Sequence, residues 1–235
     1  MCVSSLRPYL FMSCSSRVAP ILLAFGRFST AMAIHCCPWV APSDFQQGEN
    51  SRIIYAHVPA AWMSSPIHLA MAISGVLFLL TKHPLFQCFS RTGARMGALS
   101  TLLTSVTGGF WGKPMWGTFR VWDARLTPVF ISFSIYLGAL RFQEFSADVA
   151  SISTRIGPIN LPIIKFPVNR WNTLHQPSSI SQSGTPIHLS MPIPISLIPA
   201  SFSFLTRILF ILETREFIPS LSSFSVKHGM TDNNK

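Results

Sequence analysis

The sequence predicts an all-α protein: a polytopic membrane helix bundle of about six transmembrane helices, with a tryptophan-rich loop between the third and the fourth. Of its 235 residues, 49% are hydrophobic and only 11% are charged, whereas a soluble globular domain carries about 25% charged residues. The mean hydropathy is +0.40. Apolar stretches recur at the length of about 20 residues that a membrane-spanning helix needs, so the chain has room for one membrane domain.

Six spans are predicted from the apolar stretches, and the fifth is short and interrupted by prolines. The spans are Val18–Ile34, Ala60–Leu80, Met96–Phe110, Leu126–Leu140, Gly157–Val168 and Met191–Leu212. They make up one domain, residues 18–212, between an N-terminal tail, residues 1–17, and a loose C-terminal tail, residues 213–235. Two interpretations of the N-terminal region remain open. Its arginines and serines without acids are typical of a mitochondrial transit peptide, but the region also fits a first span weakened by Arg27.

Polar loops separate the spans. Ala41–Ala56 is polar, and Pro59 suits the first turn of the helix that follows, where its missing N–H costs nothing. Thr81–Arg95 carries three Lys and Arg residues and no acid, so we expect a loop on the side of the membrane where positive charge is favoured.

The net charge and the missing motifs exclude several functions. The chain has 18 Lys and Arg residues against 8 Asp and Glu residues, a formal net charge of +10. These basic residues are scattered, without the basic run or motif of a nucleic-acid-binding protein, so we expect contact with membrane lipid and with no nucleic acid. The five cysteines form no Cys-x-x-Cys pair, which argues against a zinc or thioredoxin-like site. No phosphate-binding loop for ATP is present.

The segment Phe110–Thr127 is the most informative part of the chain, because it holds three of the six tryptophans. Its notable residues are Trp111, Trp116, Trp122, Asp123 and Arg125. Tryptophan prefers the membrane–water interface, so one interpretation is an aromatic belt that anchors a helix hairpin. The other is an aromatic platform for a flat hydrophobic ligand, with Lys113 and Arg125 available for its acidic groups.

The spacing Trp-Gly-Thr-Phe-x-Val-Trp-Asp-x-Arg-Leu-Thr resembles the signature of the haem-handling membrane proteins of cytochrome c maturation. From about Ile34 to Phe210 the chain is similar to the CcmC family in its plant mitochondrial form. The resemblance implies a non-enzymatic protein of the mitochondrial inner membrane that holds b-type haem transiently, facing the intermembrane space. The implied partners are a haem chaperone and the ABC-type membrane and ATPase subunits of the same system. Plant relatives are made inside the organelle, which favours the first span over a transit peptide.

The resemblance also implies the ligands of the haem iron. His57 in His-Val-Pro-Ala-Ala-Trp and His175 in Trp-Asn-Thr-Leu-His-Gln correspond to the family's haem-ligand positions, and Trp171 precedes His175. With six spans, the two histidines and the tryptophan loop lie on one side of the membrane, which suits a bis-histidine haem site. Without the resemblance, a histidine near a helix end is more simply a capping or interfacial group.

The roles of two charged residues in the tryptophan loop stay open. Arg125 either binds a haem propionate or anchors the start of the fourth span. Asp123 more simply orients Arg125 or an indole N–H than performs acid–base chemistry, because no nucleophile or base partner stands beside it.

Several positions depart from the family pattern. Relatives have tryptophan at Arg120 and Arg170, and tend to have leucine at Ser134. They also tend to have serine at Pro128 and Pro167. Each difference is a single C-to-U change in a codon, so the hypothesis is that this sequence translates a plant mitochondrial gene before RNA editing.

Two other functions remain as alternatives. A bis-histidine b-type cytochrome subunit of an electron-transfer complex would also use two histidines, although such proteins usually ligate haem from within the spans. A solute channel would use the tryptophans only as a belt and would bind no haem.

Overall fold

The protein is described here from a computed structural model, covering residues 8–43, 45, 47–119, 123, 126–157, 159–163 and 191–232. Over these residues the chain is helical and contains no β-strand, which confirms the predicted all-α class. The elements are α1 (Pro8–Trp39), the 3-10 helix η2 (Glu49–Ile53), α2 (Ile54–Thr81), α3 (Pro84–Trp116), α4 (Leu126–Phe145), α5 (Ala147–Ser153) and α7 (Pro192–Asp232).

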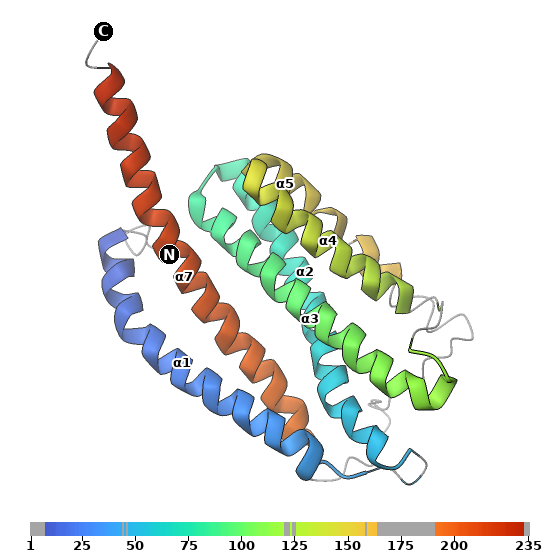
Figure 1. Ribbon diagram of the computed structural model, residues 1–235. Coiled ribbons are helices and arrows are strands. Elements are labelled where there is room, and N and C mark those ends of the chain that lie inside the picture. Colours follow the sequence, from blue (N-terminus) through green and yellow to red (C-terminus); the bar gives the residue numbers. More distant parts are fainter. Residues whose placement is uncertain are drawn as a thin grey trace.

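The helices form two groups that pack side by side. Helices α2, α3, α4 and α5 make one group, and the long helices α1 and α7 make a pair beside it (Figure 1). Helix α7 contacts α2 and α3 as well as α1, so it joins the two groups. The apolar core between them includes Met71 of α2, Met96 of α3, Tyr136 of α4 and Phe202 of α7.

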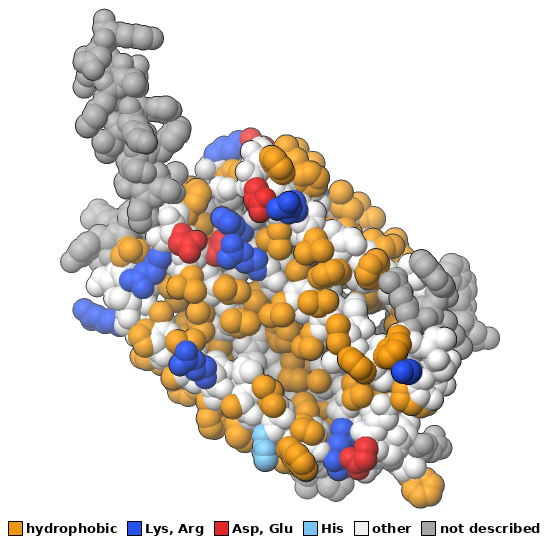
Figure 2. All heavy atoms as spheres, viewed as in Figure 1, with side chains coloured by type: hydrophobic (Ala, Val, Ile, Leu, Met, Phe, Trp, Pro, Cys, Tyr) orange, Lys and Arg blue, Asp and Glu red, His pale blue; other side chains and the backbone are white. Residues whose placement is uncertain are grey.

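Three helices in the described part of the chain are long and apolar enough to cross a membrane: Met12–Trp39, Glu49–Thr81 and Pro192–Phe217. They overlap the first, second and sixth predicted spans. Their length and composition are those of membrane-spanning helices. The described residues do not establish the predicted count of six. Hydrophobic side chains cover much of the visible face, while acidic and basic side chains gather toward the upper end (Figure 2).

Helix α3 is less apolar than its neighbours because it runs through the middle of the bundle. Several of its buried hydroxyl groups bond to the preceding helical turn: Thr101 Oγ1 donates to Gly97 O at 2.7 Å and Thr104 Oγ1 to Ser100 O at 2.8 Å. Such bonds satisfy polar side chains away from water. Gly97 also lets α4 approach closely, since a Cβ there would lie 1.9 Å from Cε1 of Tyr136. Small and hydroxyl residues are typical of helix contacts in membranes.

The structure corrects the predicted ends of the third span, Met96–Phe110. Helix α3 begins at Pro84, so most of the predicted loop Thr81–Arg95 is helical. Pro84 stands in the first turn, and the ring of His83 accepts a hydrogen bond from Leu85 N at 3.3 Å, which is a favourable helix start.

At its other end, α3 continues through Trp116, so the first third of the predicted tryptophan loop is also helical. The helix stops at Gly117, where φ is 75° and the backbone N–H bonds to Lys113 O at 2.9 Å. Glycine adopts this left-handed conformation without a steric penalty.

The C-terminal region is a second correction. Instead of a loose tail from Glu213 onward, helix α7 runs without a break to Asp232. Glu213 and Thr214 are buried, so the helix is still packed against the bundle where the sequence had suggested solvent.

The fifth predicted span, Gly157–Val168, is described only in part. Residues 159–163 are helical, and Asn160 Nδ2 bonds to both Pro128 O and Ser132 Oγ at 2.7 Å. These bonds attach the segment to the start of α4. The remainder, residues 164–168, lies outside the described residues.

Candidate functional site

The bundle has two chemically different ends (Figure 1). At one end, which we call the aromatic end, η2 and the start of α2 meet the last turns of α3; its marker residues are His57, Trp111 and Trp116. At the other, which we call the charged end, α2 turns into α3 at Lys82 and His83, and α5 and the buried Glu213 lie nearby.

His57 stands in the first turn of α2 and is half-buried against α3. Its Nδ1 lies 3.1 Å from Thr107 Oγ1. A Cβ on Gly108 would lie 2.8 Å from Cε1 of the imidazole, so the ring rests where α3 has no side chain. Thr107 and Gly108, two consecutive residues of α3, therefore form the surface on which His57 packs, which we call the seat of His57.

Trp111 holds the connection between α1 and α2 in place. The indole is buried, with only 6% of the residue exposed, and Nε1 donates to Gln47 Oε1 at 3.0 Å. In return, Asn50 Nδ2 donates to the backbone oxygen of Trp111 at 3.1 Å. These bonds bring the chain just before His57 onto the end of α3, using uncharged groups only.

Trp116 extends the aromatic surface beyond Trp111. The two indoles meet edge to face, with ring centroids 5.3 Å apart and planes at 89°, a favoured arrangement of aromatic rings. Trp116 covers Gly112, where a Cβ would lie 2.8 Å from its Cε3. Trp116 is half-buried, so it can offer ring surface to a ligand as well as to Trp111.

Farther along, the exposed ring of Phe110 meets Phe119 edge to face at 6.0 Å. Lys113 Nζ stands 4.3 Å from the centroid of the Phe119 ring, a cation–π contact. The aromatic end thus presents rings with one cation close by.

The structure brings together part of the predicted site. His57 lies against α3 about one turn before Trp111, and Trp111 contacts Trp116 at the same end of the bundle. Asp123 is also described: its backbone oxygen accepts a hydrogen bond from Thr127 N at 3.1 Å, at the start of α4. Trp122, Arg125, Trp171 and His175 lie outside the described residues, so their place in the site stays a prediction.

Four contributors were missed in the sequence: Gln47, Asn50, Thr107 and Gly108. Gln47 and Asn50 stand in a polar stretch that reads only as an exposed loop, and nothing local pairs them with a tryptophan more than 60 residues later. The Gly108-Gly109 pair within the helix was a usable signal, since a conspicuous glycine in a helix often marks a close approach.

A second histidine, His68, is fully buried within α2 and has a structural role. Its ring centroid lies 3.9 Å from that of Tyr136 in α4, and a Cβ on Gly157 would lie 2.3 Å from its Cδ2. The ring thus fills the space between α2, α4 and the segment after α5.

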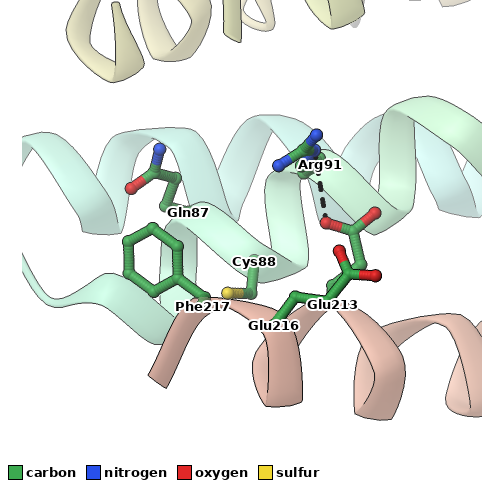
Figure 3. A pocket seen from close by; sticks show the side chains of 6 residues that line it. All are labelled: Gln87, Cys88, Arg91, Glu213, Glu216 and Phe217. Carbon is green, nitrogen blue, oxygen red and sulfur yellow. Dashed lines mark ion pairs between the residues drawn. The ribbon is translucent and has the colours of Figure 1, made fainter. Parts of the chain in front are cut away.

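The charged end holds a small cavity of about 150 Å³ between α3 and α7 (Figure 3). It is lined by Gln87, Cys88, Arg91, Glu213, Glu216 and Phe217. Drug-sized ligands occupy pockets of roughly 300–1,000 Å³, so this space is too small for a large flat ligand. Among the residues that the structure describes, no group of three or more His, Cys, Asp or Glu side chains is suited to a metal ion.

The chain is similar to known proteins over nearly its whole length. The model of a family described as heme exporter protein C matches residues 2–225. A cytochrome c biosynthesis ccmC-like mitochondrial protein of Marchantia polymorpha is 74% identical over 220 residues, which cover 94% of this chain and 96% of that protein. One of the same description from Arabidopsis thaliana is 60% identical over 226 residues, covering 96% and 88%. Heme exporter protein C of Escherichia coli K12 is 36% identical over 202 residues, covering 80% and 82%.

Proposed function

Because this chain belongs to the heme exporter protein C (CcmC) family, we propose that it is a mitochondrial membrane protein that handles haem during the maturation of c-type cytochromes. The names of its relatives support the haem-handling role and the organelle. The three membrane-compatible helices support the location in a membrane.

The proposed haem site is at the aromatic end, with His57 and His175 as axial ligands of the iron. The observation that supports this proposal is that His57 packs on Thr107 and Gly108, about one turn before Trp111 on the same helix α3. An imidazole one helical turn from indole rings fits an iron porphyrin, because nitrogen ligates the iron and the rings pack on the macrocycle. His175 and Trp171 enter through the family resemblance.

The haem is proposed to be b-type and transiently bound, held by coordination and packing, since it is cargo to be passed on. The proposed recipient is a haem chaperone, and the proposed neighbours are the ABC-type membrane and ATPase subunits of the same system. We assign no chemical conversion of haem to this chain.

The orientation follows from charge. Lys82, Arg91 and Arg95 lie at the charged end, and positive residues favour the matrix side of the inner membrane. The aromatic end would then face the intermembrane space, where c-type cytochromes are completed.

The test is the haem content of the protein purified in detergent, measured by the Soret absorbance. The variants His57→Ala and His175→Ala should each lose most of the haem, by about tenfold or more. His35→Ala, an exposed histidine of α1, is the control and should keep it. Equal haem in all four proteins would refute the ligand assignment. A tightly held haem that cycles reversibly in a redox titration would favour the b-type cytochrome instead.

We further propose that C-to-U editing changes Arg120→Trp and Arg170→Trp in the working protein, along with Ser134→Leu. Ser134 is exposed on α4, where a leucine would suit a lipid-facing surface better. Two tryptophans would enlarge the aromatic surface and remove positive charge from the side assigned to the intermembrane space. Sequencing the mature transcript decides this: arginine codons at both positions would contradict it.

A further inference from the structure

The hydroxyl of Thr107 has two kinds of neighbour but only one proton to donate. Its Oγ1 lies 2.7 Å from Leu103 O and 3.4 Å from Thr104 O, and 3.1 Å from His57 Nδ1. Carbonyl oxygens can only accept hydrogen bonds. The short contact therefore takes the proton to Leu103 O, as threonine commonly does within helices, and the oxygen turns a lone pair toward His57.

This arrangement determines which nitrogen of His57 carries the proton. Facing an acceptor, Nδ1 must be the donor, and a neutral imidazole has only one N–H. The lone pair of the ring is then on Nε2. We infer that Thr107 is a positioning residue for haem: it selects the His57 tautomer whose Nε2 can ligate the iron. This inference rests on the proposed function, since it gives His57 its role toward haem.

The position of the ring relative to Gly108 agrees with this assignment. A Cβ at Gly108 would lie 2.8 Å from Cε1 and 3.3 Å from Nδ1 of His57, but 3.8 Å from Nε2. Of these three atoms, Nε2 is the most distant from this point of α3. Helix α3 thus contacts the Nδ1 edge of the imidazole, and the Nε2 edge is directed away from Gly108.

The nature of the partner suits a protein that must release its haem. Histidines that ligate metals usually donate their second N–H to an oxygen, and removing that oxygen typically weakens metal binding by roughly 10–100-fold. A carboxylate partner would raise the basicity of the imidazole strongly, whereas the neutral hydroxyl of Thr107 orients the ring with little added charge. The ring of His57 would then be held in the orientation for binding iron, but His57 would be only a moderately strong ligand.

The first test needs no haem. In ¹⁵N-histidine-labelled protein, with the His57 signals assigned by their loss in His57→Ala, the shifts should show the proton on Nδ1 at neutral pH. Thr107→Val, nearly isosteric but without a hydroxyl, should move the proton partly or wholly to Nε2, and Thr107→Ser should restore the wild-type pattern. A wild-type ring protonated on Nε2, or a tautomer unchanged in Thr107→Val, would overturn the inference.

The second test is a haem titration of the same proteins. Thr107→Val should weaken haem binding by roughly 10–100-fold and shift the iron midpoint potential, and Thr107→Ser should recover both. Thr104→Val is the matched control, because Thr104 makes the same kind of bond within α3, to Ser100 O at 2.8 Å, and should change neither quantity. Equal losses in the two valine variants would indicate general damage to α3 and would refute a specific role of Thr107. If His57→Ala binds haem normally, the proposed role of His57 as an iron ligand fails, while the tautomer result stands by itself.

Discussion

The aromatic end and the charged end of the bundle are held together by different kinds of interaction. At the charged end, the buried Glu213 of α7 receives Arg95 Nη1 at 2.7 Å and Arg91 Nε at 3.3 Å, and Lys82 pairs with Asp148. At the aromatic end, amide, hydroxyl, indole and imidazole groups join α2, η2 and α3. The contacts between helices at the charged end carry full charges, whereas those that join η2 and α2 to α3 are neutral, and the ion pair of Arg52 with Glu49 lies within η2.

The difference teaches how one small bundle can be firm and still exchange a ligand. Hydrogen bonds to charged groups contribute about 1.5–3 kcal/mol each, and neutral ones about 0.5–1.5 kcal/mol. Regions held by weaker bonds open more easily. Opening should therefore be less costly at the end of the proposed haem site, while the ion pairs of Glu213 hold α3 and α7 together at the other end.

The largest expected effect is on the ion pairs of Glu213 with Arg91 and Arg95. Glu213→Ala would leave two arginines without their carboxylate and should lower the free energy of unfolding by about 1.5–3 kcal/mol, less than for a fully buried pair because both arginines are partly exposed. Thermal unfolding in detergent measures the loss, and the haem content per folded molecule should not change. Glu216→Ala, an exposed acid one turn away, is the control. A selective loss of haem in Glu213→Ala would contradict the separation of the two ends.

A smaller effect is expected at the seat of His57. Gly108→Ala places a methyl group 2.8 Å from Cε1 of the imidazole, and the ring must move away from α3. Haem affinity should fall by about tenfold, equivalent to about 1.4 kcal/mol. Gly138→Ala in α4, where a Cβ would meet nothing within 4 Å, should leave haem binding unchanged. Equal affinities for the two variants would mean that the ring position is unimportant.

A third change tests the attachment of the α1–α2 connection. Trp111→Phe keeps a ring in the core but removes the N–H that Gln47 accepts, which should cost about 1 kcal/mol. Faster hydrogen exchange should appear over Gly48–Ile53 and not at the charged end. Uniformly faster exchange throughout the bundle would show that Trp111 supports the whole fold and not this connection alone.

The smallest effect is expected for the exposed pair Lys82–Asp148, whose side chains are 59% and 55% exposed. Pairs of this kind contribute about 0–1 kcal/mol, so Asp148→Asn should lower stability by less than about 0.5 kcal/mol. The difference should vanish at high salt, since screening weakens exposed pairs. A loss as large as that of Glu213→Ala would show that exposure does not distinguish these two contacts.

How far the sequence predicted the structure depends on whether the relevant signal is local. The all-α class and the spans around α1, α2 and α7 follow from long apolar stretches. The prediction that His57 and the tryptophans share one side of the membrane rested on loops that alternate between the two sides, and it stays a prediction. The first two of these results needed only composition and length.

The errors arose where a distant partner changes the meaning of a residue. Glu213 follows an apolar run and suggests a solvent-exposed tail, until Arg91 and Arg95 are placed beside it by the fold. The Ser, Thr and Gly content of α3 does not suggest a helix of this length. In the structure, hydroxyl groups bond to the backbone of α3 itself, and side chains of neighbouring helices fill the space beside several of its glycines. Gln47 has no periodic pattern at all, so its bond to Trp111 could only be seen in three dimensions.

The two-residue turn at Lys82 and His83 has a consequence for the aromatic end, at the opposite end of the bundle. From His57 to Lys82 the chain advances 25 positions (82 − 57), and from His83 to Thr107 it advances 24 (107 − 83), so the arms of this hairpin match in length. One residue added to either arm would displace it by about 1.5 Å and rotate it by about 100°, carrying His57 and Thr107 out of register. If His57 ligates iron as proposed, its position is set by chain length counted from a bend about 36 Å away, at about 1.5 Å per residue.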